Sequence, residues 1–162
     1  MQQIAAVIVA ALILQLAAFS QASSTFVGTW KLVSASTRTD TGQVTDTFGS
    51  DPKGFLTYTA DGRMAVVITS SGRKPLSVND PKAAPVAERA EAFSTMVAYA
   101  GRYTLEGNKV IHHVEASWVP NQAGTDLTRF ATLQGDRIIL RTTPMLLNGA
   151  SSVVELTWER LK

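Results

Sequence analysis

Short stretches in which apolar and polar residues alternate run along most of the chain, and they limit the possible fold more than any other feature. A β-strand points successive side chains to opposite faces, so a strand with one buried face alternates in this way. Three-residue turns that contain glycine separate several of these stretches. The pattern predicts about eight strands, at residues 26–37, 54–59, 63–69, 102–105, 109–118, 125–133, 137–142 and 152–161.

Many short strands at even spacing are typical of a β-sandwich or a β-barrel, and an up-and-down order favours a closed barrel. We therefore predict an all-β, single-domain, eight-stranded antiparallel barrel. The segment VAERAEAFSTMVAY, which ends at Tyr99, departs from the pattern and has helical character. We expect an amphipathic helix between the third and fourth strands, as a lid or plug at an open end of the barrel. Its apolar face would carry Val86, Ala90, Phe93 and Val97.

The first 22 residues have the features of a secretory signal peptide. Ile4 to Phe19 form an apolar run, and Ser20-Gln21-Ala22 places small residues where a signal peptidase cleaves. The sequence predicts a signal peptide at residues 1–22 and a barrel domain at residues 23–162, secreted or periplasmic and without stable membrane insertion after cleavage. An uncleaved anchor is the alternative, because neither Lys nor Arg precedes the run.

Composition narrows the function classes. The chain has no cysteine, so neither disulfides nor thiolate metal sites are available. Its 15 basic and 13 acidic residues give a net charge of +2 and are spread along the chain. No cluster of basic and aromatic residues indicates nucleic-acid binding. We find no phosphate-binding or dinucleotide motif and no nucleophile elbow, and we expect neither a cofactor nor a metal.

The two histidines of the chain are adjacent, in the predicted strand KVIHHVEASW at residues 109–118. Strand alternation places them on opposite faces, so they cannot share a metal ion or act as a dyad. The face of His112 also carries Val110, Val114 and Trp118, and we assign it to the barrel interior. His113 then faces outward or lines the rim of the barrel.

The same alternation places further polar side chains on inward faces. We predict six ligand-binding residues: His112, Arg129, Tyr58, Tyr103, Met64 and Trp118. A buried arginine is costly without a partner. Arg129 therefore needs a ligand anion, water or an acid such as Glu155 or Asp126. For His112, a hydrogen-bonded core histidine is the alternative to a pocket group.

Several stretches resemble a known family. Gly28-Thr29-Trp30 and Trp158-Glu159-Arg160 resemble the calycin signature, in which a tryptophan closes the barrel base and stacks on an arginine. The chain is similar to the bacterial lipocalin-like domain family over residues 28–160, which is nearly all of the predicted mature protein. It implies an eight-stranded calycin barrel with a cavity for a small hydrophobic molecule, and a structural base of Trp30 and Arg160. The matching stretches are GTWKLVS, PKGFLTYTADGRMAV, AYAGRY, HHVEASWVPNQAGTDLTRF and LTWER.

These observations predict a lipocalin-like protein that binds a small hydrophobic molecule in its cavity. Arg129 favours an acidic group on that ligand. The alternative is a cofactor-free cyclase or isomerase that acts on a hydrophobic substrate in the same cavity. His112 would then be the general acid or base, and Arg129 or Tyr58 would stabilise negative charge. A third possibility is a filled barrel without a cavity that serves as an interaction module.

Overall fold

The computed structural model describes residues 25–162 of the chain. The predicted signal peptide at residues 1–22 lies outside these described residues. Ten strands form one antiparallel sheet. Their bounds are β1 (Gly28–Thr39), β2 (Val44–Asp46), β3 (Lys53–Tyr58), β4 (Arg63–Thr69), β5 (Met96–Glu106), β6 (Lys109–Ser117), β7 (Asp126–Gln134), β8 (Arg137–Thr142), β9 (Met145–Leu147) and β10 (Ala150–Arg160).

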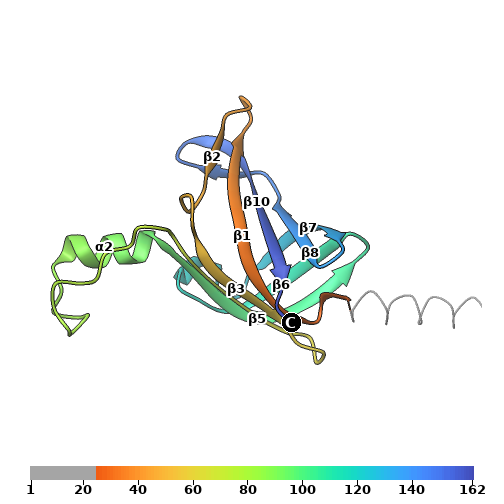
Figure 1. The fold of residues 1–162 in the computed structure, drawn as a ribbon, viewed down its shortest axis with the longest axis horizontal. Coiled ribbons are helices and arrows are strands. Elements are labelled where there is room, and N and C mark those ends of the chain that lie inside the picture. The colour runs from red at the N-terminus through yellow and green to blue at the C-terminus, as the bar shows by residue number, and fades with distance from the viewer. Residues whose placement is uncertain (1–24) are drawn as a thin grey trace, which may run out of the picture.

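Eight of these strands form a closed barrel, which confirms the predicted fold class. Successive long strands pair with each other, and β1 also pairs with β10, so the sheet closes on itself (Figure 1). The short strands β2 and β9 extend the wall beside β1 and β10. Closure satisfies the backbone hydrogen bonds of the wall and leaves few free strand edges.

Alternating side chains fill the barrel as the sequence pattern indicates. In β3 and β4, Leu56, Tyr58, Met64 and Val66 are buried, whereas the residues between them face outward. Gly107 adopts a φ of 60° in the tight turn between β5 and β6, where a side chain would be strained. The fully buried residues Trp30, Trp158, Tyr58, Leu56, Ile138, His112 and Val110 form the centre of the core.

The base of the barrel is closed by Trp30 and Arg160. The guanidinium carbon of Arg160 lies 4.1 Å from the centre of the Trp30 ring. Arg160 also donates to the backbone oxygens of Val27 and Thr25. A Cβ at Gly28 would lie 2.6 Å from Nη1 of Arg160, so glycine leaves room for this arginine. The contact therefore explains why the first strand begins with Gly-x-Trp.

The inserted helix differs from the prediction in length and position. Helix α2 spans Val86–Ser94 and none of its residues is buried. Figure 1 shows it on a segment that projects away from the barrel, so it is neither the lid nor the plug that we expected. It lies between β4 and β5, which are the predicted third and fourth strands. Their numbers are one higher because the short β2 was not predicted. None of the helices in residues 25–162 has the length and apolar character needed to cross a membrane.

The residues after Thr95 form a strand and not the last turns of the helix. Val97 and Tyr99 belong to β5, which begins at Met96. The backbone nitrogen of Ser70 donates to the carbonyl oxygen of Thr95 at 2.9 Å, so β4 and β5 already meet there. The predicted strand at residues 102–105 was therefore too short, because pairing with β4 outweighs the local helical pattern.

A β-bulge changes the faces of β6. The register between β5 and β6 shifts at Gly101, which pairs with Val114, and Glu115 is the extra residue in β6. A Cβ at position 101 would lie 2.0 Å from the carbonyl oxygen of His113, so only glycine fits. The extra residue reverses the alternation of the strand beyond Val114.

Trp118 consequently lies on the outside of the barrel. We expected it on the inward face with His112, and that placement is wrong because strict alternation does not allow for a bulge. Trp118 borders a shallow outer depression with Val67 and Ala98. The centre of its ring lies 4.3 Å from the centre of the Phe93 ring at the end of α2. The tryptophan thus joins the barrel wall to the projecting segment.

Candidate functional site

The barrel encloses a cavity of about 280 Å³. Most of its surface is aliphatic, with Leu56, Val66, Ile68, Leu127, Leu140 and Leu156 among the lining residues. Loop and edge residues such as Phe48, Gln122 and Leu147 line it at the end remote from the Trp30–Arg160 base. The third possibility, a completely filled barrel, does not describe this structure.

His112 lies in the wall of the cavity between two tyrosines. Its side chain is only 1% exposed. Nε2 lies 2.7 Å from the hydroxyl of Tyr58, and Nδ1 lies 2.9 Å from the hydroxyl of Tyr99. Both ring nitrogens are therefore hydrogen-bonded, and the three side chains form one continuous chain from the core to the cavity.

Burial keeps this histidine neutral. It lowers the pKa of His112 to about 3, and the positive charge of nearby Arg129 adds to the effect. Burial also raises the pKa of Tyr58 well above its usual value, and it raises the pKa of Tyr99. The charge of Arg129 opposes both increases. At neutral pH the three residues are thus a neutral hydrogen-bonded unit beside one positive charge.

Arg129 lines the cavity from β7. Its Nη1 donates to the backbone oxygen of Thr128 at 3.0 Å. The two acids that we considered as partners are engaged elsewhere, because Asp126 contacts His113 and Glu155 contacts Arg141. Among residues 25–162, no carboxylate forms a salt bridge with Arg129 or lines the cavity. Within the described residues, no acidic side chain therefore balances the positive charge of Arg129.

Trp158 supplies another unused donor. It lines the cavity from β10 and is 1% exposed. Its indole Nε1 is buried and has no hydrogen-bond partner within the described residues. A buried N–H without an acceptor costs about 1–3 kcal/mol. The Nε1 of Trp118, outside the cavity, is also buried without a partner within the described residues, so this feature is not specific to the cavity.

The structure brings together only some of the predicted ligand-binding residues. His112 and Arg129 line the cavity, and Tyr58 reaches it through His112. Met64 and Tyr103 are buried in the core and are not among the lining residues. Tyr103 donates to the backbone oxygen of Thr59, at 3.1 Å.

The prediction missed Tyr99 and Trp158. Tyr99 was assigned to the end of the helix, although Val97, Tyr99, Gly101 and Tyr103 continue a period of two that could have revealed the strand. Trp158 shares a face with the inward residue Leu156, but the family signature drew attention to its neighbour Arg160. Both side chains line the same cavity as His112 and Arg129.

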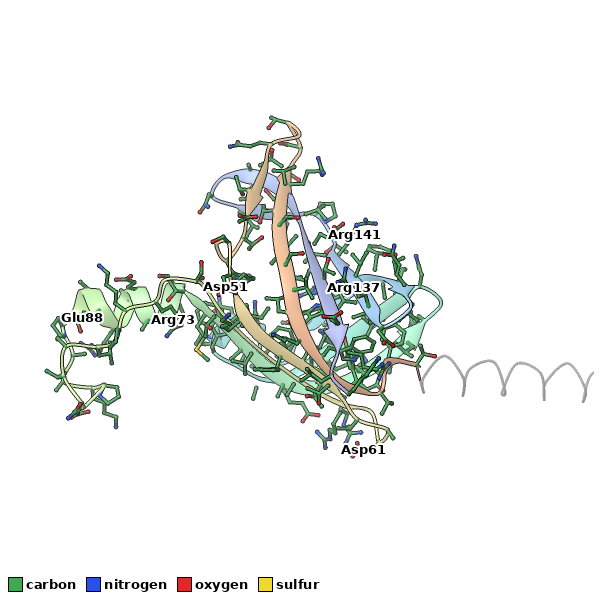
Figure 2. The ribbon with its side chains drawn as sticks, in the orientation of Figure 1. Asp51, Asp61, Arg73, Glu88, Arg137 and Arg141 are labelled. Carbon is green, nitrogen blue, oxygen red and sulfur yellow. The ribbon has the colours of Figure 1, made fainter. Side chains whose placement is uncertain are left out.

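The charged residues outside the barrel have no connection with the cavity. His113 points outward, with Nδ1 2.7 Å from Asp126 and Nε2 3.0 Å from the hydroxyl of Thr104. Arg137 and Arg141 are exposed on β8, and Arg73 and Glu88 lie on the projecting segment (Figure 2). The described part of the chain contains no group of three or more His, Cys, Asp or Glu residues placed to hold a metal.

Comparison with known families agrees with this geometry. A model of the lipocalin-like domain matches residues 27–161, which is most of the chain. The chain belongs to this family. The fold supports the binding of a small hydrophobic molecule inside the barrel.

Two individual proteins are also similar. A protein from Aspergillus oryzae, named 4'-hydroxy-3'-methoxypropiophenone carrier protein, is 35% identical over 83 residues, which cover 46% of this chain and 75% of that protein. A lipocalin-like protein of known structure from Bacteroides uniformis is 11% identical, with a TM-score of 0.44. That alignment covers 85% of this chain and 99% of the other.

Proposed function

We propose that this protein is a carrier that binds a small, mostly apolar molecule with an acidic group in the barrel cavity. The observation that carries the proposal is Arg129, a cation without an acid partner in the described chain, on the wall of a mostly apolar cavity. Arg129 is half-buried, so an anion on the ligand would pair with a charge that water solvates only in part.

Size and lining restrict the ligand further. Binding sites for small molecules usually enclose roughly 300–1,000 Å³, so a cavity of about 280 Å³ suits a small ligand. The aliphatic wall supplies most of the affinity, at about 25 cal/mol per Å² of apolar surface removed from water. Arg129 and the hydrogen-bonded side chains of Tyr58, His112 and Tyr99 then determine mainly how the ligand is oriented, and they contribute a smaller part of its affinity.

The Aspergillus oryzae relative supports the carrier role. Its name assigns it the transport of an aromatic ketone that carries hydroxyl and methoxyl groups. A molecule of similar size and polarity agrees with the aliphatic wall and the few polar groups of this cavity. We extend to this chain only the role of a carrier for a small oxygen-bearing molecule.

We further propose that the protein is secreted or periplasmic. The apolar run from Ile4 to Phe19 and the small residues before position 23 support a cleaved signal peptide. The lack of cysteine is compatible with an oxidising compartment, since no free thiol would be damaged there. Sequencing the N-terminus of the protein after export tests this proposal, and a retained residue 1 would contradict it.

The carrier role is tested by analysing what the protein binds. Protein purified from its own host is examined by native mass spectrometry and then denatured to release small molecules. We expect one small acid per chain. Arg129→Gln should weaken its binding about 10- to 100-fold, because a charge-assisted hydrogen bond contributes about 1.5–3 kcal/mol. Unchanged affinity would refute the orienting role.

A matched variant controls for the loss of positive charge. Arg141→Gln removes an arginine from the outer face of β8, where it pairs with Glu155 and does not line the cavity. We expect this variant to bind the released ligand as tightly as the unaltered protein. Equal weakening by both substitutions would mean that net charge, and not the cavity, controls binding.

The enzymatic alternative has less support from the geometry. A general base needs a free lone pair directed at the substrate. Both nitrogens of His112 are bonded to tyrosines, and its pKa of about 3 makes it a weak base. Substrate turnover that disappears in His112→Gln while binding persists would nevertheless establish catalysis over simple transport.

A further inference from the structure

The hydrogen-bond chain through His112 has a direction that the surroundings of Tyr58 determine. Tyr58 is 1% exposed, and its hydroxyl has one polar partner among residues 25–162, Nε2 of His112. If Nε2 carried the ring proton, the Tyr58 hydroxyl proton would be buried without an acceptor. The tyrosine therefore donates to Nε2. Since the imidazole is neutral, its proton lies on Nδ1.

This direction makes Tyr99 a donor to the cavity. Nδ1 of His112 donates to the Tyr99 hydroxyl oxygen, which lies 2.9 Å away. Tyr99 therefore cannot use its own hydroxyl proton in this bond. Because its side chain lines the cavity, that proton is available to a bound molecule. His112 and Tyr58 act as positioning residues, and Tyr99 is the residue that contacts the ligand.

Arg129 is a further donor in the lining of the cavity. Arg129 brings a positive charge close enough to Tyr99 to oppose the increase that burial causes in the pKa of the tyrosine. The described lining residues include no Asp or Glu that would balance the guanidinium. The cavity thus offers one positive charge and one hydroxyl donor, and no carboxylate of the described lining residues accepts from them.

We infer that the cavity binds a weakly acidic ligand as its anion, with the anionic oxygen between the Tyr99 hydroxyl and the Arg129 guanidinium. This inference rests on the proposed carrier function and narrows its ligand class. A phenolate, an enolate and a carboxylate share the required chemistry, because each presents an oxygen that accepts from both donors. Binding therefore lowers the pKa of the ligand.

A coloured phenol measures this effect directly. 4-Nitrophenol absorbs near 400 nm only as the phenolate, so the absorbance reports its ionisation. We expect the protein to increase this band in buffers below the pKa of free 4-nitrophenol, with an apparent pKa lowered by about one unit, a tenfold preference for the anion. Bound 4-nitrophenol with an unshifted pKa, together with a carboxylate that binds no better than its neutral ester, would overturn the inference.

Two tyrosine variants distinguish the loss of the Tyr99 hydroxyl donor from damage to the fold. Tyr99→Phe should remove about half of the pKa shift and reduce phenolate affinity about threefold, because the Arg129 charge remains. Tyr103→Phe is the matched control, since it deletes a hydroxyl that donates to Thr59 outside the cavity lining. It should leave the shift unchanged. Equal loss in both variants would indicate damage to the barrel, and thermal unfolding of each variant identifies that case.

Two further probes show whether the site prefers a carboxylate or a phenolate. They also show whether only the anion inference fails or the carrier proposal fails with it. 4-Nitrobenzoate offers a carboxylate, and tighter binding than 4-nitrophenol would assign the site to carboxylic acids. 4-Nitroanisole keeps the ring but has no acidic proton. If it binds as tightly as either anion, the donors do not select charge and the inference fails while the carrier role stands. If none of the three binds, the carrier proposal fails as well.

Discussion

His112 and His113 are adjacent in the chain, but β6 places one inside the barrel and the other outside. His112 is 1% exposed and bonded at both nitrogens to tyrosines. The side chain of His113 is 37% exposed and contacts Asp126 and Thr104. Each histidine has two polar partners, so the number of hydrogen bonds does not distinguish them.

The two sites differ in what replaces a lost hydrogen bond. Water can reach His113 and its partners, so a broken contact there costs little. Water cannot reach Tyr58 behind His112, and a broken bond leaves a polar atom buried without a partner. The same interaction therefore contributes more to specificity and stability on the inner face of the wall than on the outer face.

The largest expected effect follows from replacing the inner histidine. His112→Leu leaves the Tyr58 hydroxyl without a partner and removes the hydrogen bond that Nδ1 donates to the Tyr99 hydroxyl. We expect a loss of about 2–4 kcal/mol in the free energy of unfolding. His113→Leu should cost less than about 1 kcal/mol. Urea denaturation of both variants measures the difference, and equal losses would contradict the comparison.

A double variant sharpens this test. Removing both buried partners leaves no unsatisfied group, so Tyr58→Phe together with His112→Leu should be less destabilising than the sum of the single substitutions. The interaction energy is obtained from the four unfolding curves. Simple additivity would mean that the two side chains contribute independently and that the Tyr58–His112 bond does not matter for stability.

The next effect is a dependence of stability on pH. The pKa of His112 is about 3 in the folded protein, below the ordinary value of roughly 6.5 in an unfolded chain. Between these values the unfolded chain binds more protons, so stability falls as pH decreases. From pH 7 to pH 5 we expect a loss of roughly 2 kcal/mol, a window above the range in which carboxylates titrate.

Unfolding curves at several pH values in that window provide the measurement. His113→Gln should keep the dependence, because the buried histidine is unchanged. His112→Gln should remove most of it, even if the variant is less stable at every pH. A slope that persists without His112 would assign the effect to another group and would contradict a neutral, buried imidazole.

Strand alternation alone predicted the barrel and the opposite directions of the two histidines. It succeeded there because period-2 burial dominates β3, β4 and the first half of β6. It failed at Trp118 because one extra residue, Glu115, reverses the faces of β6. The signal for the bulge was Gly101 on the partner strand, which has no meaning until the two strands are paired.

The remaining errors concern residues 95–99, where two patterns overlap. Val97 continues the helical spacing of Phe93, and it also begins the alternation that includes Tyr99. Local spacing cannot choose between them, because the deciding interaction is pairing with β4, which lies before the projecting segment in sequence. The sequence therefore offered the strand as only one of two interpretations of Tyr99, whereas Arg129 could be identified from one inward strand face.

The smallest expected effect concerns the projecting segment, which lies outside the wall like His113. Replacing residues 73–93 by Asn-Gly shortens the connection between β4 and β5, whose ends already meet through Ser70 and Thr95. Helix α2 buries no residue. The losses are the contact between Phe93 and Trp118, about 0.5–1.5 kcal/mol, the burial of Ala84, and the hydrogen bond from Arg73 to the backbone oxygen of Thr95. A shorter loop offsets part of these losses.

We expect a net change below about 1 kcal/mol in the free energy of unfolding, measured by urea denaturation. Phe93→Ala in the full chain measures the ring contact alone. A loss above about 3 kcal/mol would mean that the segment stabilises the barrel as strongly as the inner hydrogen-bond chain does, and the distinction between inner and outer faces would not hold.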